Sequence, residues 1–186
     1  TFLLEPMTSE DILGKRIDQI KVFLSNHYNA IFIGILIFAI IIRFYYFTKT
    51  LHQPLWWDEA EYLLMARAWA FGLDYNFIPV RPVLFSLITS LFMKVSISEF
   101  LPRVLISLFS IGSVIGMYLL GKEFYSKKVG LIAMFLMSIF YLNLFFSFRL
   151  LVELPSLTCF TFGALYFWRY LKDNSDTKSL YLAAAI

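Results

Sequence analysis

Apolar stretches recur along the chain and are separated by short polar segments. Four of them are about as long as a helix that crosses the hydrocarbon core of a bilayer, which needs roughly 20 residues. We predict membrane spans at residues 30–47, 104–120, 129–148 and 154–171, and a further, truncated span from 179. Arg43 lies near one end of the first span, where its long side chain can extend to the lipid headgroups.

The apolar part of residues 82–97 is too short to cross a bilayer. It begins at Arg81-Pro82 and is interrupted at Lys94, which predicts a re-entrant or interfacial helix. Basic residues concentrate in the cytoplasmic loops of membrane proteins. If 82–97 does not span, nine of the 16 Lys and Arg residues lie inside, against six if it does. The first outer loop is therefore predicted to cover residues 48–103.

Residues 1–28 differ from the spans, because charges of both signs alternate with apolar positions at helical spacing. This pattern predicts a cytoplasmic amphipathic segment at the membrane surface. Its mixed charges exclude a cleaved signal peptide. Residues 29–186 then form the transmembrane module. The chain begins without Met and ends within an apolar stretch, so we expect it to be the N-terminal part of a longer protein.

The composition supports a membrane protein. Hydrophobic residues make up 60% of the chain and charged residues 16%, against usual values of about 45–50% and about 25%. This excludes intrinsic disorder. The net charge of +3 is spread without a basic stripe, which argues against a nucleic-acid partner. The predicted fold class is all-α: a polytopic transmembrane helix bundle with short juxtamembrane helices in the first outer loop.

An acidic pair, Asp58 and Glu59, lies just outside the first span. Two tryptophans precede it and suit the aromatic belt of a membrane interface. A short helix is predicted over 58–71, before Gly72. Asp58 could cap this helix, with Glu61 completing a capping box, or it could be a catalytic carboxylate. The two roles are compatible, because a capped helix end holds a carboxylate rigidly.

Three arginines are predicted on the same face as the acidic pair, namely Arg81, Arg103 and Arg149. Each could extend to the headgroups, or the three could bind a phosphate, since guanidinium groups pair bidentately with phosphate oxygens. Glu153 lies at the mouth of a span, where an ionisable group is a functional candidate by default. Its alternative role is a local ion pair with Arg149, four residues earlier.

The two histidines are isolated and match no metal-ligand spacing. Asp58, Glu59 and Glu153 could supply oxygen ligands to a divalent metal ion, so the metal requirement stays open. Asn143, inside the third span, is predicted to form a hydrogen bond between helices.

The order of these residues resembles a known family over about residues 28–186. The series is Trp-Trp-Asp58-Glu59-Ala-Glu-Tyr, Arg81-Pro82, Phe-Leu-Pro-Arg103, Gly121-Lys-Glu-Phe-Tyr-Ser-Lys-Lys, and Arg149 to Pro155. It resembles the N-terminal part of integral-membrane glycosyltransferases that use polyprenyl-phosphate sugars. Dolichyl-phosphate-mannose protein mannosyltransferases and the aminoarabinose transferases of lipid A are the most similar. No single short motif is specific, and the ordered series carries the resemblance.

The resemblance implies a role for each acid. Asp58 matches the catalytic base of the first outer loop, and Glu59 matches the second acid of the pair. Glu153 falls where the family commonly has an Asp directly before Pro, whereas here Leu154 lies between Glu153 and Pro155. Basic residues near Arg81 contact the donor phosphate in relatives.

The chemistry fits these residue types. A lipid phosphate is a good leaving group that needs charge stabilisation, which arginines supply, and the acceptor hydroxyl needs a carboxylate base. We therefore predict a glycosyltransferase that moves a hexose or pentose from a polyprenyl-phosphate donor to a hydroxyl of a protein, lipid or glycan, by an inverting single displacement. Its predicted catalytic residues are Asp58 (general base), Glu59 and Glu153, and its donor-binding residues are Arg81, Arg103 and Arg149.

A transporter or lipid flippase is the alternative, with the same charged residues along a translocation path. It would have polar residues near span centres, whereas most charges here lie at span ends and in the outer loop. A non-catalytic scaffold is a third alternative. As an enzyme, the protein is expected to be multi-pass in the plasma membrane with its site facing outside, or in a eukaryote in the ER membrane facing the lumen.

Overall fold

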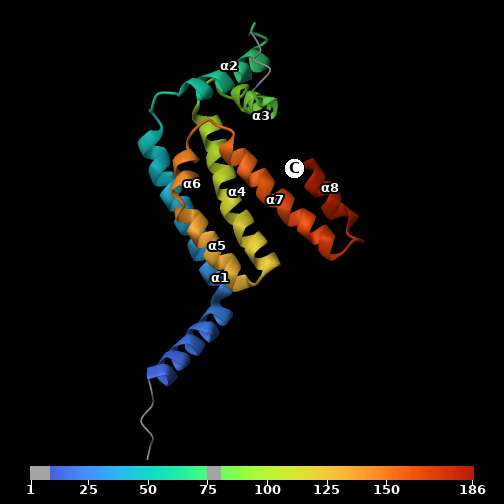
Figure 1. Cartoon of the computed structure of the whole chain (residues 1–186). Coiled ribbons are helices and arrows are strands. Elements are labelled where there is room, and N and C mark those ends of the chain that lie inside the picture. Colours follow the sequence, from blue (N-terminus) through green and yellow to red (C-terminus); the bar gives the residue numbers. More distant parts are fainter. Residues whose placement is uncertain (1–8, 75–80) are drawn as a thin grey trace, which may run out of the picture.

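The computed structural model describes residues 9–74 and 81–186, and within these the side chains from residue 27 onward. This part of the chain is built from helices, which confirms the all-α prediction (Figure 1). The helices are α1 (Ser9–Thr50), α2 (Trp57–Phe71), α3 (Val83–Met93), α4 (Phe100–Phe124), α5 (Lys127–Ile139), α6 (Tyr141–Phe146), α7 (Glu153–Lys172) and α8 (Thr177–Ala185).

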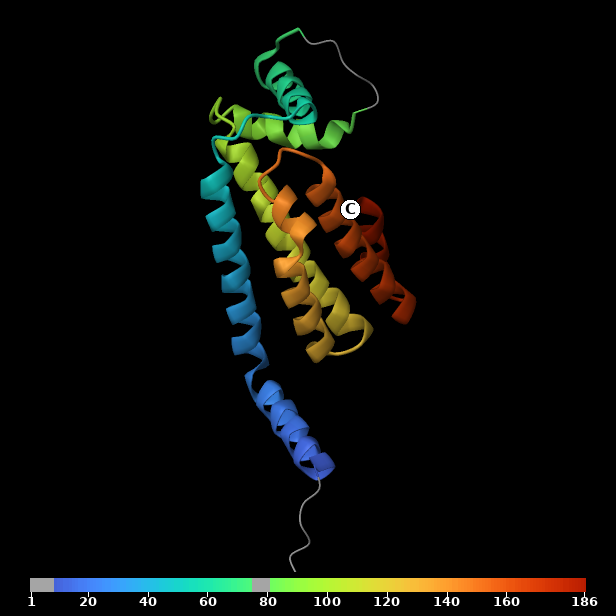
Figure 2. The same cartoon turned by 60° about the vertical axis from the view of Figure 1, so that its left-hand side comes forward.

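Helix α1 consists of two parts that meet at a kink. His27 has non-helical dihedral angles (φ −123°, ψ 19°), and the part before it extends away from the other helices (Figures 1 and 2). The second part, His27–Thr50, and α4 are long and apolar enough to cross a membrane. The segment 1–28 is helical from Ser9, but its predicted amphipathic side chains lie outside the described residues.

The helix over the span predicted at 129–148 is interrupted, and the span itself stays a prediction. Helix α5 ends at Ile139, Phe140 has an extended backbone (φ −64°, ψ 119°), and the short α6 follows. Helix α7 covers the expected span 154–171, and α8 lies at the span expected from 179. Their crossing of a membrane stays a prediction.

Helix α4 is the centre of the bundle, with α1, α5 and α7 packed around it (Figure 1). Glycines allow the close approach. A Cβ atom at Gly130 of α5 would lie 2.6 Å from the Tyr118 carbonyl oxygen, and one at Gly116 would lie 2.9 Å from Thr161 Cγ2. Larger residues at these positions would force α5 or α7 away from α4.

Arg43 does not extend to the headgroups as predicted. Its side chain is buried in the bundle, with a residue exposure of 2%, and it donates a hydrogen bond to Asn143 of α6. The prediction that Asn143 joins helices by hydrogen bonds is thereby confirmed. Arg43 stays inside because polar groups of other helices meet its guanidinium there.

Helices α2 and α3 lie across one end of the bundle (Figure 2). The last residues of α1, the start of α4 and the loop between α6 and α7 meet at the same end (Figure 1). This α6–α7 loop comprises residues 147–152, and Leu150 and Leu151 are buried against α2. Burial of a leucine side chain contributes about 1.5–3 kcal/mol, so this apolar cluster, which includes residues of α2, α3 and α4, helps to hold the α6–α7 loop in place. The shared end agrees with the predicted grouping of 48–103 with the segment around Arg149.

Candidate active site

The acidic pair lies in the first turn of α2, but its capping differs from the prediction. The N-cap is Trp56 rather than Asp58. The Trp56 backbone N–H donates to Glu59 Oε2 at 2.7 Å, so Glu59, not Glu61, folds back on the helix start. At the other end Gly72 has φ 66°, a left-handed conformation that ends the helix. Asp58 therefore stays outside the cap.

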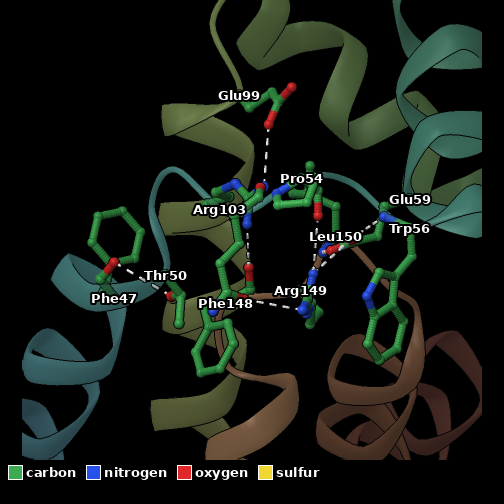
Figure 3. Close-up of polar contacts among 11 residues, drawn as sticks. Phe47, Thr50, Pro54, Trp56, Glu59, Glu99, Arg103, Phe148, Arg149 and Leu150 are labelled. Carbon is green, nitrogen blue, oxygen red and sulfur yellow. Dashed lines mark hydrogen bonds and ion pairs between the residues drawn. The ribbon is translucent and has the colours of Figure 1, made fainter.

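Glu59 is fully buried, with a residue exposure of 0%. Its Oε1 accepts from the Leu150 backbone N–H at 2.8 Å, and its Oε2 lies 3.2 Å from Arg149 Nη1. Figure 3 shows these contacts between α2 and the α6–α7 loop. A buried carboxylate is tolerated only when paired and hydrogen-bonded, and Glu59 meets this condition. It ties the α6–α7 loop to the start of α2.

Arg149 is also buried and lies between two loops (Figure 3). Its guanidinium donates to Gln53 Oε1 at 3.0 Å and to the Pro54 carbonyl at 3.4 Å. The guanidinium carbon lies 4.2 Å from the centre of the Trp56 ring, a cation–π contact. Glu59 takes the place of Glu153 as its acidic partner, because residues 149–152 are not helical and i, i+4 spacing does not apply there.

Arg103, in the first turns of α4, is 1% exposed. It donates to the Phe148 carbonyl at 2.9 Å and to the Gln53 carbonyl at 3.3 Å, and its Nη2 lies 3.2 Å from Glu99 Oε2. Arg103 and Arg149 thus join the loop that follows α1, the start of α4 and the α6–α7 loop. The Nε atoms of Arg103 and Arg149 are buried without a hydrogen-bond partner.

Asp58 and Arg81 are the accessible members of the site. Arg81 Nη2 donates to Asp58 Oδ1 at 2.5 Å, and their side chains are 26% and 52% exposed, respectively. The hydrogen bond from Arg81 to Asp58 raises the pKa of the guanidinium above its ordinary value. Arg81 also lies over the Tyr62 ring, 5.7 Å from its centre. The pair offers solvent a carboxylate beside a permanent cation.

An apolar cavity of about 390 Å³ lies between α3, α4 and α7. Pro82, which follows Arg81 directly, is part of its wall. The other lining residues include Phe85, Phe109, Val152 and Cys159.

Glu153 is exposed at the first turn of α7, and its role as a second acid stays a prediction. Among the described residues, no group of three or more His, Cys, Asp or Glu side chains could hold a metal ion. The requirement for a divalent metal ion therefore also stays a prediction.

Sequence reasoning missed Gln53, Trp56 and Leu150 as parts of the site. Gln53 contributes its side-chain amide oxygen and its backbone carbonyl, and Leu150 contributes its backbone N–H. Neither residue belongs to a motif that a single sequence would reveal. Trp56 was assigned to the membrane interface, and its contact with Arg149 depends on how the α6–α7 loop folds back.

The described chain is thus a helical bundle with apolar helices long enough to cross a membrane and an acidic and basic cluster at one end. Residues 79–186 match the family model of the dolichyl-phosphate-mannose-protein mannosyltransferases. Because this match covers more than half of the chain, the protein belongs to that family of membrane-embedded glycosyltransferases. No curated protein matches the chain. No solved structure matches it either.

Proposed function

We propose that the protein transfers a sugar from a polyprenyl-phosphate donor to an acceptor hydroxyl, with Asp58 as the general base. The observation that carries this proposal is the Asp58–Arg81 pair, an accessible carboxylate 2.5 Å from a guanidinium at the end of the bundle. A base and a phosphate-binding cation are the two groups that this reaction needs. Membership of the mannosyltransferase family supports the same reaction class.

In the proposed reaction the Asp58 carboxylate takes the proton of the acceptor hydroxyl. The hydroxyl oxygen forms a bond to the anomeric carbon of the sugar, while the bond from that carbon to the phosphate oxygen breaks. The electron pair leaves with the polyprenyl phosphate, whose charge Arg81 stabilises. A single displacement inverts the configuration at the anomeric carbon. Donor phosphate competes with Asp58 for Arg81, so donor binding frees the carboxylate to act as a base.

Three buried charged residues position the Asp58–Arg81 pair in this proposal, namely Glu59, Arg103 and Arg149. Glu59 is enclosed by protein groups, so we assign it to positioning Asp58 rather than to proton transfer. The contacts of Arg103 and Arg149 favour the same positioning role. Direct contact of these two arginines with the donor phosphate is the alternative to this positioning role. Glu153 is proposed as a second acid near the acceptor.

The cavity beside Pro82 supports a lipid-linked donor. It is apolar, and Pro82 in its wall directly follows Arg81 in the sequence, so we propose that an isoprenoid chain occupies it while its phosphate reaches the guanidinium. The donor headgroup would then lie at the depth of the membrane surface. The acceptor is a hydroxyl of a protein, a lipid or a glycan.

We further propose a multi-pass arrangement with the Asp58 end facing outward, or facing the lumen in an ER membrane. The excess of Lys and Arg in the opposite loops supports this orientation. Membrane lipids would surround the exposed apolar faces of α1 and α4.

The decisive experiment uses the full-length protein in detergent micelles, with a polyprenyl-phosphate sugar and a set of protein, lipid and glycan acceptors. Micelles have no two compartments, so a transporter or flippase would leave the sugar on its lipid. The proposal predicts release of polyprenyl phosphate together with a glycosylated acceptor of inverted configuration. Unchanged donor with every acceptor class would contradict it.

A further inference from the structure

Arg43 is a buried cation in the middle of the bundle. Its Nε donates to Ser110 Oγ at 2.6 Å and its Nη2 donates to Asn143 Oδ1 at 2.5 Å. Its Nη1 donates to the Ala39 carbonyl at 3.0 Å and to the Ser138 carbonyl at 3.3 Å. Within the described residues no carboxylate pairs with it. A charge inside a membrane bundle is costly and is by default functional.

The Ser138 carbonyl needs a donor because of the break at Phe140. Helix α5 ends at Ile139 without a proline or glycine at the break, so its last carbonyl groups lose their helical partners. In an apolar environment such groups must be satisfied by other parts of the protein. Arg43 supplies one donor to Ser138 and holds Asn143, in the first turn of α6. It therefore bonds to both sides of the break.

Asn143 is held from α4 as well. Ser110 Oγ donates to Asn143 Oδ1 at 2.6 Å, and Asn143 Nδ2 donates to Ser113 Oγ at 2.7 Å. Arg43, Ser110 and Asn143 thus form one buried network between α1, α4 and α6. The network fixes where α6 begins and in which direction it runs.

The direction of α6 determines where the α6–α7 loop lies. That loop begins at Ser147, whose carbonyl accepts from Ser107 Oγ at 2.7 Å. Three residues later, the Leu150 backbone N–H bonds to Glu59, next to Asp58. A continuous set of contacts therefore leads from Arg43 through α6 and the α6–α7 loop to the start of α2.

We propose that Arg43 is a positioning residue that holds the broken helix α5–α6, and through it seats the α6–α7 loop on Glu59. Its relevance to sugar transfer rests on the proposed function, but the seating of the loop can be measured without activity. Loss of Arg43 leaves the Ser138 carbonyl without its side-chain donor and leaves Asn143 Oδ1 with Ser110 as its remaining donor. We therefore expect α6 to shift and the α6–α7 loop to leave α2.

The test measures thiol labelling of Leu150→Cys in the full-length protein in detergent, on a Cys159→Ala background. Leu150 is 1% exposed, so its cysteine reacts slowly with a maleimide while the α6–α7 loop is seated. We expect Arg43→Met to raise the labelling rate about tenfold or more, because the loop opens locally. The matched control is Lys49→Met, which removes an exposed cation from the same helix and leaves the rate unchanged.

A second cysteine separates local release from general unfolding. Leu165 of α7 is also 1% exposed and lies away from the α6–α7 loop, so Leu165→Cys stays protected in Arg43→Met if the proposal holds. An equal rise at both positions, or no rise at Leu150→Cys, overturns it. The labelling rates do not depend on sugar transfer. A failure of this proposal can therefore be told apart from a failure of the proposed function, which the transfer assay measures.

Substitution of Asn143 provides a rescue test. Asn143→Asp keeps an acceptor for Arg43 and adds a charge partner, so we expect Leu150→Cys to stay protected. Asn143→Leu removes the acceptor, so we expect Leu150→Cys to be labelled as fast in this variant as in Arg43→Met. In the transfer assay, Arg43→Met should lower kcat while Asn143→Asp retains it. Equal labelling of the two Asn143 variants would contradict the proposal.

Discussion

The carboxylates of Asp58 and Glu59, adjacent in the sequence, lie in different environments. Asp58 is about half exposed and pairs with Arg81. Glu59 is fully buried and bonds to Arg149 and to the Leu150 backbone N–H. Successive residues of a helix point about 100° apart, so the first turn of α2 can present one acid to solvent and the other to the protein interior.

The different environments predict different effects on stability. Glu59→Gln leaves the buried Arg149 without a charge partner, so we expect a loss of about 3 kcal/mol or more. Asp58→Asn removes only an exposed pair, and we expect the melting temperature to stay near that of the wild type. Thermal unfolding of both variants in the same detergent measures this. Equal melting temperatures for the two variants would contradict the assignment of Glu59 as a positioning residue.

Arg81 is predicted to bind the donor phosphate. Arg81→Gln should raise the donor KM about tenfold or more, and Arg81→Lys should restore part of the affinity, because a lysine keeps the charge but not the bidentate geometry. Steady-state kinetics with varied donor measure this. An unchanged donor KM in Arg81→Gln would show that the phosphate binds elsewhere.

The donor KM should also be independent of pH over a wide range. The bond to Asp58 raises the pKa of Arg81, and a cation with a raised pKa keeps its charge until the pH approaches that higher value. We therefore expect the same donor KM at about pH 7 and about pH 9. A KM that rises over this window would point to a cation with a lower pKa at the phosphate.

Arg103 is predicted to act on stability rather than on donor affinity. Arg103→Lys cannot reach Phe148, Gln53 and Glu99 together, so the melting temperature should fall. The donor KM of the folded variant should match that of the wild type. If instead the KM rises while the melting temperature is unchanged, Arg103 contacts the phosphate directly through its free Nε.

The positions of most helices could be predicted from the sequence, because the length of each apolar stretch indicates the length of the helix that it forms. The short helix before Gly72 and the helix after Pro82 appear as α2 and α3. The break at Phe140 could not be predicted, since that position has neither proline nor glycine and the cause lies in partners from α1 and α4. Arg43 was assigned to the headgroups for the same reason: its acceptors are distant in the sequence.

The candidate site was predicted in part. The sequence placed Asp58, Glu59 and Arg149 at one end of the bundle, and the structure brings Glu59 and Arg149 into contact. It could not tell which acid is buried, because that depends on the α6–α7 loop folding back on α2. The expected partner of Arg149, Glu153, followed from helical spacing in a segment that is not helical.

The most direct test of Asp58 as the general base is the kcat of Asp58→Asn for sugar transfer, measured with saturating donor. Loss of a general base lowers kcat by about 10²- to 10⁴-fold. We expect the donor KM not to rise, because Asp58 no longer competes for Arg81, and the melting temperature to change little. Asp74→Asn, which removes another exposed carboxylate of the same loop, should keep the wild-type rate. Transfer by Asp58→Asn at the wild-type kcat would contradict the account.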